Sequence, residues 1–374
     1  MTAQNPSRWV RAPLSAFTRV AGFAALLLLA SHTLACSSEQ AATPRVDGGH
    51  VDEDGGMEED GGTPQADGGQ AMDAGPAVLN ATPIEAIFIQ PRDDNRFLTS
   101  AIGAARTSVD GFFYILTDDG VERAIAAAKR RNVRVRVLVD GNLAVNNSAK
   151  RYLGDAGVEV RNAPGRFTNN HQKSVVVDNA RAFIMTLNPS AAAFNDNREY
   201  AVEVRRRAEL DDMTRLFDAD WNNQPDPVVT SPLVVSPMNA RDRIQNLIGR
   251  ATQDLLVTVE VFTDDGVRSA LLARKNSGVR VRILLADPRD VDANAQNAMV
   301  LKSYGLEVRF LRSPTLHAKL IVADTRLAYV GSVNLTPTSM GRNREVGVII
   351  DQVPVVQQLR TQAEADWTAG TPAP

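Results

Sequence analysis

One motif occurs twice in this chain, and that repeat constrains the fold more than any other feature. Residues 170–188 read NHQKSVVVDNARAFIMTLN, and residues 316–334 read LHAKLIVADTRLAYVGSVN. The two histidines are 317 − 171 = 146 positions apart, and the same offset relates Asn188 to Asn334. A duplication of this length predicts two similar halves packed about a pseudo-twofold axis, with equivalent residues facing each other near the axis.

The repeat extends well beyond the motif. TDDGV occurs at 117–121 and at 263–267, and NRE occurs at 197–199 and at 343–345. We therefore expect the same order of helices and strands in residues 81–228 and in residues 229–370, which we take as the two halves. A proline-rich segment at 224–237 is the expected linker between them.

Apolar periodicity predicts alternating helices and strands in each half. In the first half the helices are expected at 97–106, 119–131, 148–155 and 209–221, and the strands at 109–115, 133–139, 158–161, 172–177, 181–187 and 199–204. The second half should run in the same order, from a helix near 241–250 to one at 355–367. This alternation predicts an α/β protein of two α/β/α layered halves with mixed, mostly parallel sheets.

The amino-terminal segment has the pattern of an export signal. Arginines precede a short apolar run at 20–30, and Thr33-Leu34-Ala35-Cys36 follows. The run is shorter than the roughly 20 residues that span a bilayer. Residues 1–36 therefore resemble a lipoprotein-type signal peptide in which Cys36 becomes lipidated. This predicts an extracytoplasmic, membrane-anchored protein, or a secreted one if Cys36 is not lipidated.

Residues 37–80 are rich in aspartate and glycine and contain little that a core could bury. We expect a disordered acidic tether that remains extended. A calcium-binding interpretation lacks the EF-hand spacing. Without residues 1–80, the rest of the chain has 41 − 4 = 37 basic and 44 − 10 = 34 acidic residues. This faintly basic body suits a phosphate-bearing substrate but lacks the strongly basic surface of a dedicated duplex-DNA binder.

The histidines indicate the chemistry. Beyond residue 80 the sequence contains only His171 and His317, each at the same motif position, so we predict that both are catalytic. The same residues carry no cysteine and no His-x-x-x-His spacing. The neighbouring Lys173 and Lys319 would repel a cation. We therefore expect neither a metal nor another cofactor.

The other polar motif residues are suited to binding an anion. These are Lys173 and Lys319, the hydroxyls of Thr186 and Ser332, and the amides of Asn188 and Asn334. Converging on one phosphoryl group, they would stabilise a transition state in which one histidine attacks phosphorus and the other protonates the leaving oxygen.

Two pairs of carboxylates complete the candidate catalytic set. Glu199 follows its histidine by 199 − 171 = 28 positions, and Glu345 follows its histidine by 345 − 317 = 28. The equal spacing suggests that each carboxylate orients the histidine of its own half through the far ring nitrogen. A surface salt bridge to a neighbouring arginine is the alternative. Asp178 and Asp324 belong to the motif but close tight turns, which favours a mainly structural role.

HxKxxxxD followed by GSxN, present twice, resembles the phospholipase D superfamily. The resemblance covers roughly residues 85–370 and implies metal-independent phosphodiester cleavage through a phosphohistidine. It also implies that His171 is the nucleophile and His317 the acid. The first copy departs from the pattern, because Met185 stands where the second has Gly331. The added bulk is expected to narrow the pocket or reduce activity without removing a catalytic group.

The superfamily includes lipid hydrolases, cardiolipin synthases, nucleases and inactive members. The body has no transmembrane segment, which weighs against a cardiolipin synthase, and the expected lipid anchor favours a phospholipid substrate. We therefore predict phospholipase D-type hydrolysis of phospholipid head groups by a monomer, because one chain carries both motifs. The alternatives are a secreted or surface-anchored endonuclease and a catalytically weak anion- or lipid-binding lipoprotein.

Overall fold

The computed structural model describes residues 81–374. The predicted signal peptide, the lipidation at Cys36 and the acidic tether lie outside the described residues. They stay predictions.

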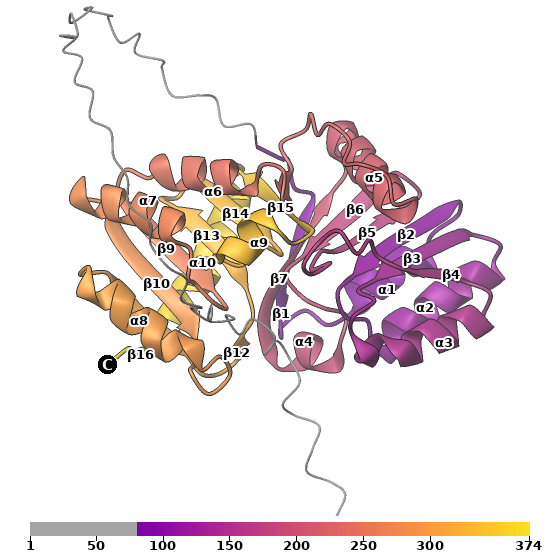
Figure 1. Cartoon of the computed structure of the whole chain (residues 1–374), viewed down its shortest axis with the longest axis horizontal. Coiled ribbons are helices and arrows are strands. Elements are labelled where there is room, and N and C mark those ends of the chain that lie inside the picture. The colour runs from indigo at the N-terminus through magenta and orange to yellow at the C-terminus, as the bar shows by residue number, and fades with distance from the viewer. Residues whose placement is uncertain (1–80) are drawn as a thin grey trace, which may run out of the picture. The chain divides into compact units, whose positions relative to one another are not determined.

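The first half follows the predicted order closely (Figure 1). Its strands are Ala86–Gln90 (β1), Ser108–Phe113 (β2), Arg134–Val139 (β3), Glu159–Asn162 (β4), Lys173–Val177 (β5), Arg181–Met185 (β6) and Asn197–Val204 (β7). Its helices are Arg96–Gly103 (α1), Asp119–Arg130 (α2), Asn147–Asp155 (α3), Ala191–Asn195 (α4) and Arg207–Trp221 (α5), with a 3-10 turn at Ala144–Asn146 (η1).

The second half repeats this order. Its strands are Val234–Ser236 (β8), Asp254–Val259 (β9), Arg280–Ala286 (β10), Glu307–Leu311 (β11), Thr315–Leu316 (β12), Lys319–Ala323 (β13), Leu327–Gly331 (β14), Glu345–Ile350 (β15) and Thr371–Pro372 (β16). Its helices are Ala240–Gly249 (α6), Asp265–Asn276 (α7), Ala293–Ser303 (α8), Pro337–Gly341 (α9) and Val353–Ala369 (α10).

Local sequence explains why the repeated helices begin where they do. Asp118 caps α2 by accepting a hydrogen bond from the backbone N–H of Val121 at 2.8 Å. Asp264 caps α7 in the same way, accepting from the N–H of Val267 at 2.9 Å. Each cap satisfies a backbone donor that has no partner within the helix. The TDDGV repeat therefore sets the start of the same helix in both halves.

Each half contains one mixed sheet, as predicted. The strand orders are β1-β7-β6-β5-β2-β3-β4 and β16-β11-β10-β9-β13-β14-β15-β8. Within these two orders, parallel neighbours are confined to β2-β3-β4 and β9-β10-β11. Neighbouring strands are therefore mostly antiparallel, contrary to the expected predominance of parallel pairs. Tight turns join β5 to β6 and β13 to β14, and a turn of that length can only reverse the chain.

Four strands were not predicted: β1, β8, β12 and β16. β8 lies inside the segment expected to be a linker and pairs with β15, while β1 precedes the first predicted element and pairs with β7. β8 is three residues long and is followed by Pro237, so its strand signal is weak. β1 and β8 are each completed by pairing with a longer strand from elsewhere in the half.

Successive side chains along a strand point to opposite faces of the sheet, so each sheet packs on two sides. On β6, Phe183 and Met185 pack beneath the helices α1 and α2. The intervening Ile184 faces the other way, into a core shared with Val330 and Val348 of the second half. The halves are therefore joined by a common apolar core. Within residues 81–374, no helix combines the length and apolarity needed to cross a membrane.

Candidate active site

Both histidines directly precede a buried strand. β5 begins at Lys173 and β13 begins at Lys319, two residues after His171 and His317 respectively. Lys173 pairs with Phe113 at the end of β2, and Lys319 pairs with Val259 at the end of β9. The motif therefore enters each sheet at the end of a neighbouring strand.

Backbone hydrogen bonds join the chain before each motif histidine to a strand of the opposite half. β12, just before His317, pairs in parallel with the start of β7 in the first half (Figure 1). The N–H of His317 donates to the carbonyl of Arg198 at 3.3 Å. On the other side of the pseudo-twofold axis, the N–H of Arg344, just before β15, donates to the carbonyl of Asn169, two residues before His171, at 3.0 Å. Each histidine therefore lies beside the strand that carries the other half's glutamate.

The histidine–glutamate pairs consequently cross between the halves. Nδ1 of His171 lies 3.0 Å from both carboxylate oxygens of Glu345. Nδ1 of His317 lies 2.6 Å from Oε1 of Glu199. The prediction that the 28-residue spacing marks bonded pairs was wrong, because the spacing reflects the repeat and not a contact within one half.

These contacts fix which ring nitrogen is available for chemistry. A carboxylate only accepts hydrogen bonds, so Nδ1–H of each imidazole donates one. Nε2 is therefore the ring nitrogen left to react with a substrate. The glutamates are fully buried and the histidines nearly so. Burial would raise the pKa of Glu345, but the charge and hydrogen bond of His171, the charge of Lys173 and a hydrogen bond from Ser332 hold the pKa below its ordinary value.

The motif lysines are buried beside the histidines. Nζ of Lys173 donates to the carbonyl of His171 at 2.6 Å, and Nζ of Lys319 donates to the carbonyl of His317 at 2.7 Å. Both side chains are almost fully buried. Each ammonium is therefore held against the backbone of its own histidine. The predicted part of both lysines in anion binding stays a prediction.

The motif hydroxyls make hydrogen bonds within the protein. Oγ1 of Thr186 donates to Oε2 of Glu199 at 2.5 Å and accepts from the N–H of Tyr200 at 2.9 Å. Oγ of Ser332 accepts from the N–H of Val346 at 3.1 Å. Thr186 thus supports the glutamate that orients His317. The predicted part of Thr186 and Ser332 in phosphate binding stays a prediction.

The two amides remain candidates for contact with substrate. Asn188 and Asn334 are buried, and the side-chain oxygen of each has no hydrogen-bond partner within residues 81–374. A buried amide oxygen that accepts no hydrogen bond is costly, and a ligand group that donates one, such as a hydroxyl, can satisfy it. Their predicted part in phosphate binding stays a prediction.

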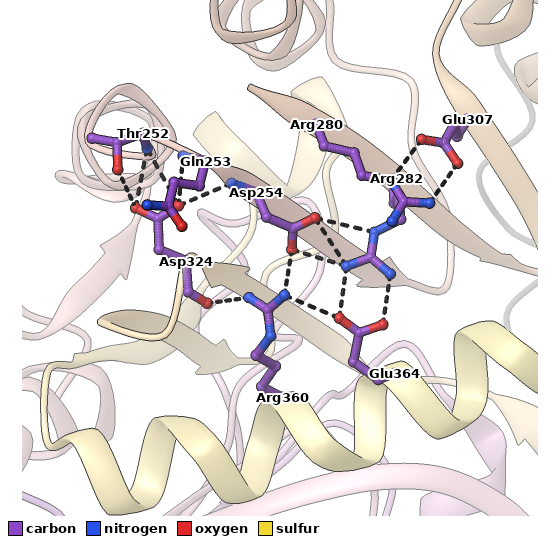
Figure 2. Close-up of polar contacts among 9 residues, drawn as sticks. All are labelled: Thr252, Gln253, Asp254, Arg280, Arg282, Glu307, Asp324, Arg360 and Glu364. Atoms are coloured by element: carbon purple, nitrogen blue, oxygen red, sulfur yellow. Dashed lines mark hydrogen bonds and ion pairs between the residues drawn. The ribbon is translucent and has the colours of Figure 1, made fainter. Parts of the chain in front are cut away.

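Asp178 and Asp324 accept hydrogen bonds from backbone N–H groups. This agrees with the mainly structural role that their position in tight turns favoured. Asp324 accepts hydrogen bonds from the N–H groups of Thr252, Gln253 and Asp254, at 3.0, 2.8 and 2.9 Å (Figure 2). Asp178 does the same for residues 106–108. Burial raises the pKa of Asp324, but these backbone donors outweigh it and lower the pKa. Each motif aspartate ties its turn to the start of the neighbouring strand.

Tyr114 and Glu260 were missed from the sequence. Both follow the strand that pairs with the motif strand, and they are equivalent in the repeat, since 260 − 114 = 146. The Tyr114 ring lies edge-on to His171, with ring centroids 4.7 Å apart. Oε2 of Glu260 lies 2.8 Å from Nζ of Lys319. Aligning the two copies residue by residue identifies this position.

The departure at Met185 is accommodated inside the protein. Met185 is fully buried in the outer core of the first half. In the second half the equivalent space is occupied, because a Cβ on Gly331 would lie 2.5 Å from the hydroxyl of Tyr329 and 2.4 Å from Cα of Gly347. Phe183, the first-half equivalent of Tyr329, has no hydroxyl at that point. An effect of Met185 on activity stays a prediction.

The described residues 81–374 contain no group of three or more His, Cys, Asp or Glu side chains placed to hold a metal ion. The arrangement offers instead two imidazoles with oriented Nε2 atoms, two buried ammonium groups and two buried amides. Such a set can bind an anionic group and exchange protons with it.

Comparison with known proteins agrees with this geometry. A family model described as "Cardiolipin synthase, PLD-like domain" matches residues 98–221 and 244–367. A cardiolipin synthase of Oceanobacillus iheyensis is 26% identical over 322 residues, which cover 73% of this chain and 66% of that protein. Cardiolipin synthase B of Escherichia coli K12 is 28% identical over 308 residues, covering 70% of this chain and 74% of that one. The chain thus spans just under two thirds of the first relative.

Among solved structures, a phosphatidylserine synthase of Haemophilus influenzae superposes with a TM-score of 0.65. The match is 14% identical and covers 78% of this chain and 88% of that one. At this identity the likeness concerns the fold alone, and it agrees with two mixed-sheet halves.

Proposed function

Since the chain belongs to the phospholipase D superfamily, we propose that it cleaves the phosphodiester bond of a phospholipid through a phosphohistidine and releases the head group. The crossed histidine–glutamate pairs are the observation that carries this proposal. They orient two imidazoles, each with Nδ1 held by a carboxylate from the opposite half.

The chemistry follows from that arrangement. Nε2 of one histidine attacks phosphorus while Nε2–H of the other protonates the departing oxygen. Water, activated by the second histidine, then displaces the first and restores the enzyme. The buried ammonium groups of Lys173 and Lys319 stabilise the negative charge on phosphorus during both steps. Following the superfamily pattern, we take His171 as the nucleophile and His317 as the acid.

The same intermediate can be attacked by an alcohol instead of water. The names of the two curated relatives favour such a transfer, in which the phosphatidyl group passes to a second lipid. Sequence reasoning set cardiolipin synthesis aside, and the comparisons make it a candidate again. We keep hydrolysis as the proposed reaction and make transfer one arm of the test.

The proposed setting is a membrane surface. A lipidated Cys36 would tether the body to the bilayer that supplies its substrate, and the tether would allow it to reach the head groups. Because both motifs form one site in one chain, we propose that the protein acts as a monomer, which light scattering of the purified protein can test.

The test uses the full chain in EDTA with vesicles of phosphatidylcholine, phosphatidylglycerol or cardiolipin, and with single- and double-stranded DNA in parallel. We expect head-group release from at least one lipid, and its loss in His171→Ala. Cardiolipin formed from phosphatidylglycerol would identify transfer. DNA cleavage without lipid turnover would replace the proposal with an endonuclease, and wild-type turnover by His171→Ala would remove the nucleophile.

A further inference from the structure

Glu260 breaks the symmetry of the site. It follows β9, as Tyr114 follows β2, and the two positions are held alike. The side-chain amide of Asn294 donates to the carbonyl of Glu260 at 2.7 Å, and that of Asn146 donates to the carbonyl of Tyr114 at 2.9 Å. The repeat therefore preserves the backbone at this position and changes only the side chain, from a phenol to a carboxylate.

The carboxylate of Glu260 is buried among the second motif's polar groups. Its Oε2 accepts hydrogen bonds from Nζ of Lys319 at 2.8 Å and from the amide of Asn334 at 3.1 Å. The same oxygen forms an ion pair with Nε2 of His317 at 3.4 Å. Because Glu199 holds Nδ1 at 2.6 Å, the imidazole of His317 lies between two carboxylates.

His171 has different surroundings. Glu345 is the carboxylate at its Nδ1, and the ring of Tyr114 lies edge-on to the imidazole at 4.7 Å. Nζ of Lys173 lies 4.9 Å from the centre of that tyrosine ring. At the position where the second motif has a negative charge, the first therefore has a neutral aromatic group.

The charges around each ring favour different protonation states. His317 faces Glu199 from β7, Glu260 after β9 and Lys319 on β13, two negative groups against one positive. Near His171 lie Glu345 from β15 and Lys173 on β5, and the position equivalent to Glu260 carries the neutral ring of Tyr114. Burial raises the pKa of Glu260, but the charges of His317 and Lys319 and its hydrogen bonds outweigh burial and lower the pKa, so Glu260 is ionised. An imidazolium is favoured between two carboxylates.

We propose that Glu260 is a positioning residue that keeps His317 protonated, and so makes His317 the proton donor and leaves His171 as the nucleophile. This rests on the proposed function. In the first step the Nε2 lone pair of His171 forms the N–P bond, the P–O bond to the head group breaks, and the leaving oxygen takes the Nε2 proton of His317. In the second, His317 takes a proton from water, the water oxygen bonds to phosphorus, and the N–P bond breaks.

A titration followed by NMR tests this without turnover. Imidazole ¹⁵N signals of the full chain, which contains four histidines, are assigned with His171→Asn and His317→Asn. We expect His317 to deprotonate at higher pH than His171. Glu260→Gln should lower the His317 midpoint by about one pH unit or more. Glu203→Gln is the control. It removes a buried carboxylate that lies on the same strand as Glu199 and is bonded to Arg181 and Arg205. This variant should leave the His317 midpoint unchanged.

A leaving-group comparison tests the same point in catalysis. A phosphatidyl ester of p-nitrophenol departs without needing a proton, whereas a natural head-group alcohol needs one. Glu260→Gln should slow turnover of the natural lipid by about tenfold or more, a part of the roughly 10²–10⁴-fold that a general acid contributes, and slow the nitrophenyl ester much less. If Glu260→Gln is unfolded in a thermal melt, Glu260→Tyr, which copies the first half, repeats both measurements.

The outcomes separate the two proposals. An unmoved His317 midpoint, or equal losses on both esters, would overturn the role of Glu260 while the proposed function stood. A wild-type protein inactive on every diester would remove the proposed function, and the NMR titration would still decide whether Glu260 holds the proton on His317.

Discussion

Nδ1 of His171 lies 3.0 Å from both carboxylate oxygens of Glu345, which belongs to the other half of the chain. Neither half therefore contains a complete histidine–glutamate pair, and the two halves must be docked for either histidine to be oriented.

A double-mutant cycle tests that crossed pairing. His171→Asn and Glu345→Gln should be coupled by about 1 kcal/mol or more in the free energy of unfolding, because each mutation removes the other's buried partner. His171→Asn combined with Glu199→Gln is the matched control. Urea unfolding should show a coupling below about 0.5 kcal/mol for that pair. Stronger coupling within the first half would contradict the crossed arrangement.

A second prediction concerns the ion pairs between the halves. The buried guanidinium of Arg344 donates to Asp220 on α5 of the first half at 3.0 Å. Arg344→Met should lower the free energy of unfolding by about 2 kcal/mol, because Asp220 loses one buried partner and keeps Arg166 at 2.7 Å. The exposed pair Arg280–Glu307 provides the control, since Arg280→Met should cost less than about 1 kcal/mol. Equal effects of the two mutations in urea unfolding would contradict the account.

The third prediction follows from the lowered pKa of Asp324. Its folded pKa lies below the ordinary value of 3.8, so the ionised side chain adds stability above about pH 4. This stability is lost as the pH falls toward the folded pKa. Asp324→Asn should cost about 2 kcal/mol at pH 7 and less at pH 3. Urea unfolding at both pH values measures this, with the exposed Asp351→Asn as the control; a cost independent of pH would refute the role of the charge.

The fourth prediction concerns Gly331. A Cβ there would lie 2.4 Å from Cα of Gly347 and 2.7 Å from the carbonyl of Val346, so backbone must move. Gly331→Ala should destabilise the protein by about 1–3 kcal/mol. Gly103→Ala, at a helix end with nothing within 4 Å of the added Cβ, is the matched control. Thermal melts should show a fall in Tm for the first variant only, and a normal Tm for Gly331→Ala would show that the space is not closed.

Much of this protein was predictable from the repeat and from local pattern. The strand carrying Lys173 and the helix capped by Asp118 follow from apolar alternation and a capping carboxylate, which act over a few residues. The partner of His171 did not follow, because Glu345 reaches it only through the docking of two halves. The sequence spacing pointed to Glu199 instead.

The roles of the smaller motif residues were also beyond the sequence. Thr186 was expected to contact phosphate, and its hydrogen bond to Glu199, a residue 13 positions along the chain, did not follow from the motif. Glu260 was overlooked because a glutamate near the end of a strand gives no signal of its own. It becomes informative only when the repeat places it opposite Tyr114 and the fold brings it to His317.

The most direct test is to trap the covalent intermediate. His317→Asn retains the nucleophile but lacks the group that activates water, so with the phosphatidyl ester of p-nitrophenol it should release a burst of about one nitrophenolate per chain. Mass spectrometry should then find the phosphatidyl group on the peptide containing His171, and no adduct in a variant that also carries His171→Asn. An adduct on another residue, or steady turnover with no adduct, would contradict the double displacement at His171.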